Sequence, residues 1–309
     1  MNEHALPPLV AIVGPTAVGK TALSIALAQR LSGEIVNADS RQIYRYMDIG
    51  TAKPTPAEQA AVPHHLIDMI APDEPYSLAV YQEQALSTID RITAQHHLPL
   101  LVGGTGQYAA AVLEGWNIPR VPPQPEVRAR LEAEADAQGT IALYQRLRTL
   151  DPEAAGKIEP NNRRRIIRAL EVFEITGAPI STQQTKTPPP YRIVTLWLVL
   201  DRPTLYRRID ERVDAMIAAG LVAEVRGLLE RGYDWTLPAM SSLGYKEFRP
   251  HFEHAAPLDE CIQRLKFNTH AFVRKQDMWF KRLPCCVQLP ADDPVLLDRA
   301  LAEIAGSTR

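Results

Sequence analysis

One stretch near the start of the chain, residues 14–21, limits the possible folds more than any other. It reads GPTAVGKT and matches G-x-x-x-x-G-K-[ST], the pattern of a phosphate-binding loop. The apolar run Leu9–Val13 before it is typical of a buried parallel strand, and the leucine spacing predicts a helix over Thr21–Leu31 that Gly33 ends. A strand, a glycine-rich loop and a helix in this order bring backbone N–H groups and a helix N-terminus to one phosphate group. We therefore expect an α/β protein whose phosphate site is built from Gly14, Pro15, Thr16, Ala17, Val18, Gly19, Lys20 and Thr21.

Two side chains of this loop have expected roles. The Lys20 ammonium would reach the terminal phosphates, and the Thr21 hydroxyl would hold a magnesium ion, Mg²⁺. The loop alone specifies neither the phosphate compound nor the bond that breaks.

The composition narrows the class of protein. The chain has 309 residues, of which 46% are hydrophobic, and no apolar run approaches the ~20 residues of a membrane span. The first residues lack the basic and apolar parts of a signal peptide, and three cysteines are too few for a disulfide framework. We expect a reduced, cytoplasmic monomer with no membrane segment.

Positive charge is concentrated locally, although the net charge is only −2. The segment 120–192 holds 12 Lys/Arg against 9 Asp/Glu, and the segment 264–282 holds 6 Lys/Arg against Asp277 alone. Such clusters are what a polyanionic partner requires, and they are equally compatible with solvated helix faces.

A carboxylate and a glycine-rich turn follow two further expected strands. The run Glu34–Ala38 is β-prone and leads to Asp39, which could be a general base, a Mg²⁺ ligand or a turn residue. The strand Leu98–Val102 leads to Gly103–Gly106, where a generic ATPase would carry an acidic residue. Glycine allows close approach of the backbone, so we expect a substrate packed against this strand end.

The middle of the chain has a different pattern. Proline-rich stretches bracket a segment with only helical periodicity, which predicts an inserted all-helical subdomain over residues 115–192 in a core formed by 1–114 and 193–309. Spacing of three and four places Arg164, Arg165 and Arg168 along one side of a helix, either for phosphate contact or facing solvent.

The chain then returns to the sheet. Ile193–Leu200 reads as a buried strand, and one long helix is expected to carry Ile209 through Val225 on one face. A further long helix is expected over about Asp259–Phe280, and Cys285–Leu289 could be a last strand. The adjacent His64 and His65 would face different directions, so structural roles are expected for both rather than a metal site.

These stretches together resemble those of one known family, the bacterial tRNA dimethylallyltransferases, also called tRNA isopentenyltransferases. The resemblance spans most of the chain in the family's order, and the Asp48–Pro54 and double-histidine stretches are its most specific parts. The similar stretches are Gly14–Thr21, Asn37–Tyr44, Met47–Pro54, His64–Asp68, Gly103–Gly106, Arg168–Phe173, Leu243–Lys246 and Arg274–Phe280.

The resemblance implies a P-loop NTPase-like parallel sheet flanked by helices, with the inserted helical subdomain binding tRNA. It also implies transfer of a dimethylallyl group from dimethylallyl diphosphate to the N6 amino group of the adenosine 3′ to the anticodon, with release of diphosphate. Asp39 would be the base, Thr105 would lie beside the reacting adenine, and Arg212 would contact the diphosphate together with Mg²⁺. The adenine would have to leave its base stack to react.

The resemblance further implies a surface for the tRNA anticodon stem-loop. The residues it assigns to this surface are Asp39, Ser40, Arg41, Gln42, Thr105, Arg128, Arg164, Arg165, Arg168, Gly244, Tyr245 and Lys246. The chain departs from the family pattern at Gln107, where Leu is usual, and at His270, where Arg is common, which puts one positive contact in doubt.

Two other functions remain open on the residues alone. A P-loop kinase for a small hydroxylated molecule would also need the loop and Asp39, but it leaves the basic helical insert unexplained. A nucleotide-switched RNA-binding module fits less well, because the chain lacks the Asn-Lys-x-Asp motif that reads guanine.

Overall fold

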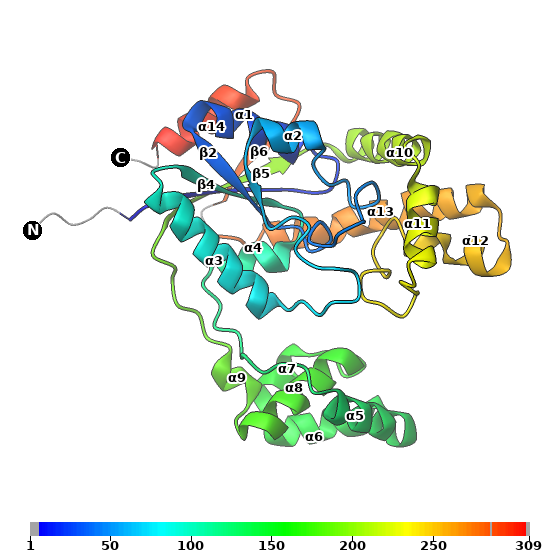
Figure 1. The fold of residues 1–309 in the computed structure, drawn as a ribbon. Helices are drawn as coiled ribbons and strands as arrows, with labels where there is room; N and C mark the ends of the chain where they lie inside the picture. Colours follow the sequence, from blue (N-terminus) through cyan, green and yellow to red (C-terminus); the bar gives the residue numbers. More distant parts are fainter. Residues whose placement is uncertain (1–5, 285, 307–309) are drawn as a thin grey trace, which may run out of the picture. The chain divides into compact units, whose positions relative to one another are not determined.

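A parallel sheet forms the centre of the core in this computed structural model, which describes residues 6–284 and 286–306. Within the described residues the sheet has six strands in the order β3-β2-β4-β1-β5-β6 (Figure 1). The strands are β1 (Pro8–Val13), β2 (Gly33–Asn37), β3 (His64–His65), β4 (Leu98–Gly103), β5 (Arg192–Val199) and β6 (Cys286–Pro290). The predicted parallel α/β sheet is therefore confirmed.

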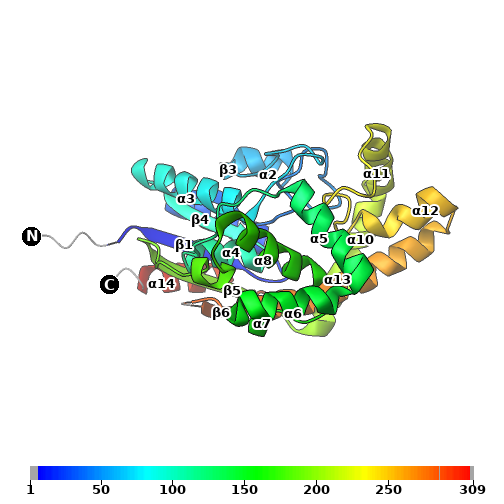
Figure 2. The same cartoon turned by 90° about the horizontal axis from the view of Figure 1, so that it is seen from below.

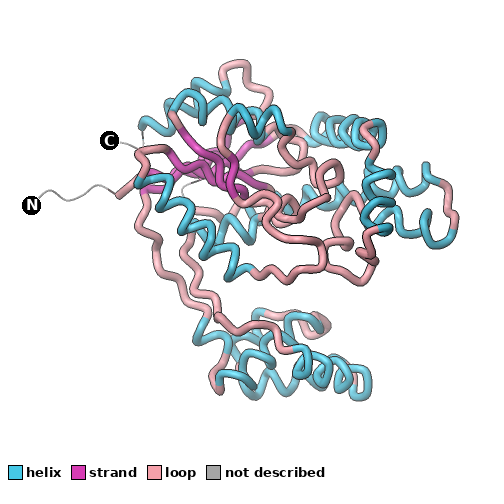
Figure 3. The backbone as a smooth tube through the Cα atoms, viewed as in Figure 1, coloured by secondary structure: helices cyan, strands magenta, loops and turns pink. Residues whose placement is uncertain are grey.

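Helices cover both faces of this sheet (Figure 3). Helices α1 and α14 lie on one face, and α3 and α4 lie on the other (Figure 1). The run Leu9–Val13 is wholly buried for this reason, which explains why its sequence is continuously apolar. The helices of the core are α1 (Lys20–Leu31), α2 (Pro56–Ala61), α3 (Leu78–Ala94), α4 (Gly106–Leu113), α10 (Arg202–Ala218), α11 (Leu221–Glu230), α12 (Arg249–His254), α13 (Leu258–Phe280) and α14 (Leu296–Gly306), with a 3₁₀ turn η1 (Lys246–Phe248).

The strand order brings three strand ends together. In β1 and β4, Val13 pairs with Gly103, and in β2 and β4, Asn37 pairs with Val102. The loops that follow these strands therefore leave the same edge of the sheet. At this edge open α/β sheets form their ligand sites.

The segment Gly115–Pro188 is a second compact unit with its own core. Figure 2 shows its helices α5 (Pro125–Gln138), α6 (Thr140–Leu150), α7 (Pro152–Lys157) and α8 (Arg163–Thr176), and a short helix α9 (Ile180–Gln183) follows. Leu131, Leu147, Ile166 and Leu170 pack together inside it. The two ends of the segment meet where the Asn117 N–H donates to the Thr185 carbonyl at 2.9 Å.

The structure differs in detail from the sequence expectations at three element ends. The predicted end of helix α1 at Leu31 is confirmed, but Ser32 rather than Gly33 takes the left-handed conformation there, and Gly33 already begins β2. The expected single helix through Val225 is two helices, because the backbone turns at Gly220 with φ of 101°. The helical segment expected over 115–192 corresponds to the unit Gly115–Pro188, and Arg192 already begins β5.

The predicted last strand begins at Cys286 in the structure, and Cys285 lies outside the described residues. No helix in the described part of the chain combines the length and the apolar character that a membrane crossing requires.

Candidate active site

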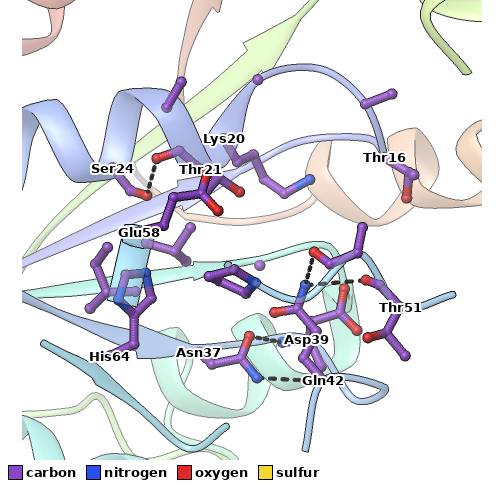
Figure 4. A pocket seen from close by; sticks show the side chains of 18 of the residues that line it. Thr16, Lys20, Thr21, Ser24, Asn37, Asp39, Gln42, Thr51, Glu58 and His64 are labelled. Atoms are coloured by element: carbon purple, nitrogen blue, oxygen red, sulfur yellow. Dashed lines mark hydrogen bonds between the residues drawn. The ribbon is translucent and has the colours of Figure 1, made fainter. Parts of the chain in front are cut away.

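A cavity of about 420 Å³ opens at the sheet edge where β1, β2 and β4 end. The phosphate loop forms one wall with Lys20 and Thr21, and Asp39 faces them from the loop after β2 (Figure 4). Helix α10 adds Arg208 and Arg212 to the lining. The structure thus gathers two carboxylates, those of Asp39 and Glu58, and three cationic side chains at a single hollow.

The phosphate loop is held in a conformation that requires glycine. Gly14 has φ of 153°, and a Cβ atom there would lie 2.8 Å from the Leu198 carbonyl oxygen. The backbone N–H of Thr16 donates to the side chain of Gln276 at 3.0 Å, which fixes the loop to α13. Lys20 Nζ donates to the carbonyls of Gly14 and Pro15, both at 2.9 Å.

The pKa of the Lys20 ammonium group is shifted from its ordinary value. Burial lowers its pKa to about 8, and Arg212 adds to this effect, while the Asp39 carboxylate opposes it. A phosphate group in the cavity would reverse the shift, because negative charge favours the ammonium form. Binding of an anion in the cavity would therefore stabilise the charged form of Lys20.

The backbone around Asp39 is held by Asn37. The Asn37 side chain donates to the Asp39 carbonyl and accepts from the Asp39 N–H, both at 3.1 Å. The Arg41 N–H donates to Asp39 Oδ1 at 2.9 Å. A Cβ atom on Gly104 would lie 3.6 Å from Asp39 Oδ2 and 3.8 Å from Lys20 Nζ, so both charged groups flank this glycine.

Thr105 joins the ends of β4 and β2. Its hydroxyl accepts the Ser40 N–H at 3.0 Å and donates to the Ser40 hydroxyl at 3.2 Å. Gly103 lines the cavity, and the absence of a side chain there has a second consequence. A Cβ atom there would lie 2.1 Å from the Ala38 carbonyl oxygen, so this glycine allows two strand ends to touch.

Arg212 is brought to the cavity by α10. Burial lowers its pKa, and the carboxylates of Asp39 and Glu58 partly offset this effect. Arg208 precedes it by one helical turn and lines the same cavity. From the sequence, no role was assigned to Arg208.

Three other residues of the site were missed from the sequence. Two of them, Glu58 and His64, line the cavity beyond Asp39 (Figure 4). Gln42, which was expected at the tRNA surface, also lines the cavity and donates to the carbonyls of Thr51 and Ala52. His64 Nδ1 lies 2.7 Å from the Val62 carbonyl, and burial lowers the pKa of the ring. Since a carbonyl only accepts, Nδ1 carries the proton of the neutral ring and Nε2 keeps its lone pair.

The third missed residue, Gln276, is a positioning residue. It accepts from Thr16 of the phosphate loop and donates to the Gly104 carbonyl at 2.8 Å, so it joins two walls of the site. It lies in the family-like stretch Arg274–Phe280, but its role could not be predicted because its partners lie far away in the sequence.

The two most specific family stretches are tied together by Lys53. Its ammonium lies 2.5 Å from a carboxylate oxygen of Asp48 and 2.5 Å from one of Asp68, and it is almost fully buried. The turn 48–50 is also held by Glu224 of α11, whose carboxylate accepts its three backbone N–H groups. These contacts hold the two stretches together beside the site.

Among the core residues expected at the tRNA surface, some are exposed and others are buried. Arg41 donates to the Pro238 carbonyl at 3.0 Å, and the Lys246 side chain is half exposed. The Tyr245 side chain is instead fully buried, and its hydroxyl donates to Glu224 at 2.6 Å. Gly244, with φ of 94°, packs against Gly50. Tyr245 and Gly244 therefore pack inside the core.

The arginines of the helical unit that were expected at the tRNA surface also fall into two groups, one paired inside the unit and one exposed. Arg128 makes a bidentate pair with the buried Glu171 at 2.8 and 2.9 Å, and Arg168 contacts the same carboxylate at 2.7 Å. Arg164 and Arg165 are exposed and have no ion-pair partner in the described part of the chain. Arg168 is thus engaged inside the unit, and the adjacent pair is available to a polyanion.

Burial alone would raise the pKa of Glu171, but hydrogen bonds from Arg128, the Gln124 N–H and Arg168 hold this pKa below its usual value. Glu171 was not singled out in the sequence, because a lone glutamate in a helix gives no sign of burial.

The two departures from the family pattern have different surroundings. Gln107 is exposed on the first turn of α4. His270 Nε2 lies 2.9 Å from Asp210, and its ring stacks on Tyr206 with the centroids 4.2 Å apart. His270 therefore joins α13 to α10.

The assignment of a Mg²⁺ ion to the Thr21 hydroxyl stays a prediction. Thr21 lines the cavity, and the described residues contain no group of three or more His, Cys, Asp or Glu side chains that could hold a metal ion. Mg²⁺ typically takes few protein ligands and completes its shell with phosphate oxygens and water.

A parallel sheet with a glycine-rich loop between β1 and α1, and a cationic cavity above that loop, defines a P-loop protein. Residues 42–283 match the family model described as IPP transferase, and residues 7–68 match the one described as isopentenyl transferase. The chain belongs to the IPP transferase family.

Curated relatives and solved structures agree with this assignment. The chain is 65% identical over 295 residues to the tRNA dimethylallyltransferase of Roseiflexus castenholzii, covering 96% of each chain. It is similar to the crystal structure of the tRNA isopentenylpyrophosphate transferase of Bacillus halodurans, with a TM-score of 0.72, 39% identity and coverage of 97% and 98% of the two chains. It is also similar to a eukaryotic dimethylallyltransferase acting on tRNA, with a TM-score of 0.81, 29% identity and coverage of 97% and 77%.

Proposed function

We propose that this protein transfers the dimethylallyl group of dimethylallyl diphosphate to the N6 amino group of the adenosine 3′ to the anticodon in tRNA. The observation that carries the proposal is the single cavity in which the phosphate loop, Asp39 and Arg212 meet. Family membership supports the same reaction over a kinase. The phosphate loop would then hold the diphosphate leaving group.

The proposed chemistry needs a base beside the attacking N6 nitrogen and an anion site for the diphosphate on the opposite side of the allylic carbon. The N6 nitrogen forms a bond to the allylic carbon, the carbon–oxygen bond to diphosphate breaks, and the N6 proton passes to Asp39. Asp39 suits this role because Asn37 fixes its backbone and it faces Lys20 across the cavity. Thr105, bonded to Ser40, lies at the strand end next to Asp39 and would contact the adenine.

The leaving group would be bound by positive charge. Lys20, Arg212 and the backbone N–H groups of the loop would stabilise the charge that grows on the diphosphate as the bond breaks. Mg²⁺, held by the Thr21 hydroxyl, would supply further charge neutralisation at the phosphate oxygens. Arg208 is a further candidate for this role because it lines the same cavity.

Recognition of tRNA would use both compact units. We propose contacts from Ser40, Arg41, Gln42 and Lys246 in the core, and from Arg164 and Arg165 in the helical unit. The exposure of this arginine pair supports phosphate contact.

One incubation series tests the reaction. Purified protein and Mg²⁺ are mixed with labelled dimethylallyl diphosphate and unmodified tRNA, with parallel samples that hold ATP. We expect label on the tRNA and intact ATP. Consumption of ATP without label on the tRNA would contradict the proposal and favour a small-molecule kinase.

A further inference from the structure

Tyr46 has an unusual combination of backbone conformation and exposure. Its φ of 68° lies in the left-handed region, which a bulky residue rarely adopts, and the residue is 42% exposed. The residues on either side of it along the chain have ordinary φ values. A disfavoured conformation that presents an aromatic ring to solvent suggests a role for the ring outside the fold.

The Tyr46 ring is placed by two neighbours from a distant segment. The ring of Tyr233 stacks near it, with the centroids 6.4 Å apart and the planes inclined by 22°. The Arg231 guanidinium carbon lies 4.5 Å from the centroid of the Tyr46 ring. Two aromatic rings and one cation therefore form a cluster, here called the Tyr46 platform.

The Tyr46 platform is continuous with the proposed tRNA surface. Tyr46 belongs to the loop after β2, which also carries Asp39 and Arg41. Arg41 donates to the Pro238 carbonyl, so the segment that holds Tyr233 runs beside this loop in two places (Figure 1). An RNA strand that presents an adenosine to Asp39 could therefore reach Tyr46.

The exposed aromatic ring of the Tyr46 platform favours a base over a phosphate as the occupant. Arg45 next to the platform is paired with Glu74 at 3.6 Å, and Arg231 is engaged with the Tyr46 ring. A neutral planar group gains most from such a surface, because stacking on an aromatic ring needs no net charge.

We propose that the Tyr46 platform stacks an unpaired base of the RNA strand that carries the reacting adenosine. This inference rests on the proposed function. When one adenosine is extruded from a loop, its neighbours lose a stacking partner, and an aromatic side chain can replace it. The platform would hold the strand so that the extruded adenosine stays at Asp39.

The test compares Tyr46→Asn with Tyr46→Phe. Asparagine tolerates the left-handed region, so Tyr46→Asn removes the ring without straining the backbone, and Tyr46→Phe keeps the ring. The probe is an unmodified anticodon stem-loop RNA with 2-aminopurine beside the reacting adenosine. Its affinity is measured at several salt concentrations, and its fluorescence reports stacking.

We expect Tyr46→Asn to weaken RNA binding about five-fold or more, with an unchanged salt slope and less quenching of 2-aminopurine. Tyr46→Phe should match the wild type, and the KM for dimethylallyl diphosphate should be unchanged in both. Wild-type affinity and quenching in Tyr46→Asn, or a loss with a reduced salt slope, would overturn the inference. If the wild type binds RNA but transfers no group, the proposed function fails instead.

Discussion

Lys20 and Asp39 carry opposite charges into the same cavity, yet they are not hydrogen-bonded to each other in the described structure. Lys20 is bonded to the carbonyls of its own loop, and Asp39 is bonded to the Arg41 N–H. Each group is therefore available for a different part of a substrate. This separation is what a reaction with a basic side and an anionic leaving group requires.

The lowered pKa of Lys20 predicts a pH dependence of diphosphate binding. With a pKa of about 8 in the free enzyme, Lys20 is charged below pH 8 and loses its proton as the pH rises through 8. We therefore expect kcat/KM for dimethylallyl diphosphate to fall above about pH 8, because the cavity loses a positive charge.

The Lys20→Arg variant is the matched control, since arginine keeps its charge throughout this range. Its profile should stay flat above pH 8, whatever its absolute activity. The same alkaline decline in Lys20→Arg would assign the titration to another group.

At the scale of elements, helix α8 combines two functions on one short stretch. Arg164 and Arg165 face solvent, whereas Arg168 reaches back to the buried Glu171, which Arg128 of α5 also contacts. The arginine-rich sequence therefore includes one part of an internal ion cluster and one part of an exposed surface.

This division predicts different results for two substitutions. Arg165→Ala should weaken tRNA binding with a salt slope reduced by about 0.7–0.9 and little change in melting temperature, because it removes one exposed phosphate contact. Arg128→Ala should lower the stability of the helical unit by about 2 kcal/mol, because it leaves a buried carboxylate with fewer donors.

Thermal melts and tRNA titrations of the two variants at several salt concentrations check this prediction. An unchanged salt slope in Arg165→Ala would place α8 away from the phosphates. Full stability in Arg128→Ala would mean that Arg168 and the Gln124 N–H suffice for Glu171.

Sequence patterns correctly predicted the elements whose structure depends on residues close together in the chain. The phosphate loop, its strand and its helix could be predicted because each depends on neighbouring residues, and Asp39 could be placed at the sheet edge because it follows an expected strand. The turn at Gly220 was missed because the apolar spacing continues across it.

Long-range contacts could not be predicted in this way. Gln276 joins the phosphate loop to β4 from 260 residues away, and Glu224 holds the turn at Gly50 from 174 residues away. Tyr245 was expected at a surface because its stretch resembles a tRNA-contacting one, but tertiary packing buries its side chain. Such roles depend on the whole fold.

At the scale of the whole molecule, a net charge of −2 gives no general attraction to RNA. Binding must then depend on where the positive and aromatic groups lie. The exposed arginines of α8, Lys246 and the Tyr46 platform are local features of this kind, on both compact units. The cavity that holds the phosphate loop belongs entirely to the core.

The central claim is that Asp39 takes the N6 proton while the phosphate loop holds the leaving diphosphate. The most direct measurement is the single-turnover rate of label transfer to tRNA by the wild type and by Asp39→Asn, which keeps the side-chain shape and the acceptor for the Arg41 N–H. We predict a rate at least about 100-fold lower in Asp39→Asn, with tRNA affinity within several-fold of the wild type. A wild-type rate in Asp39→Asn would contradict the account.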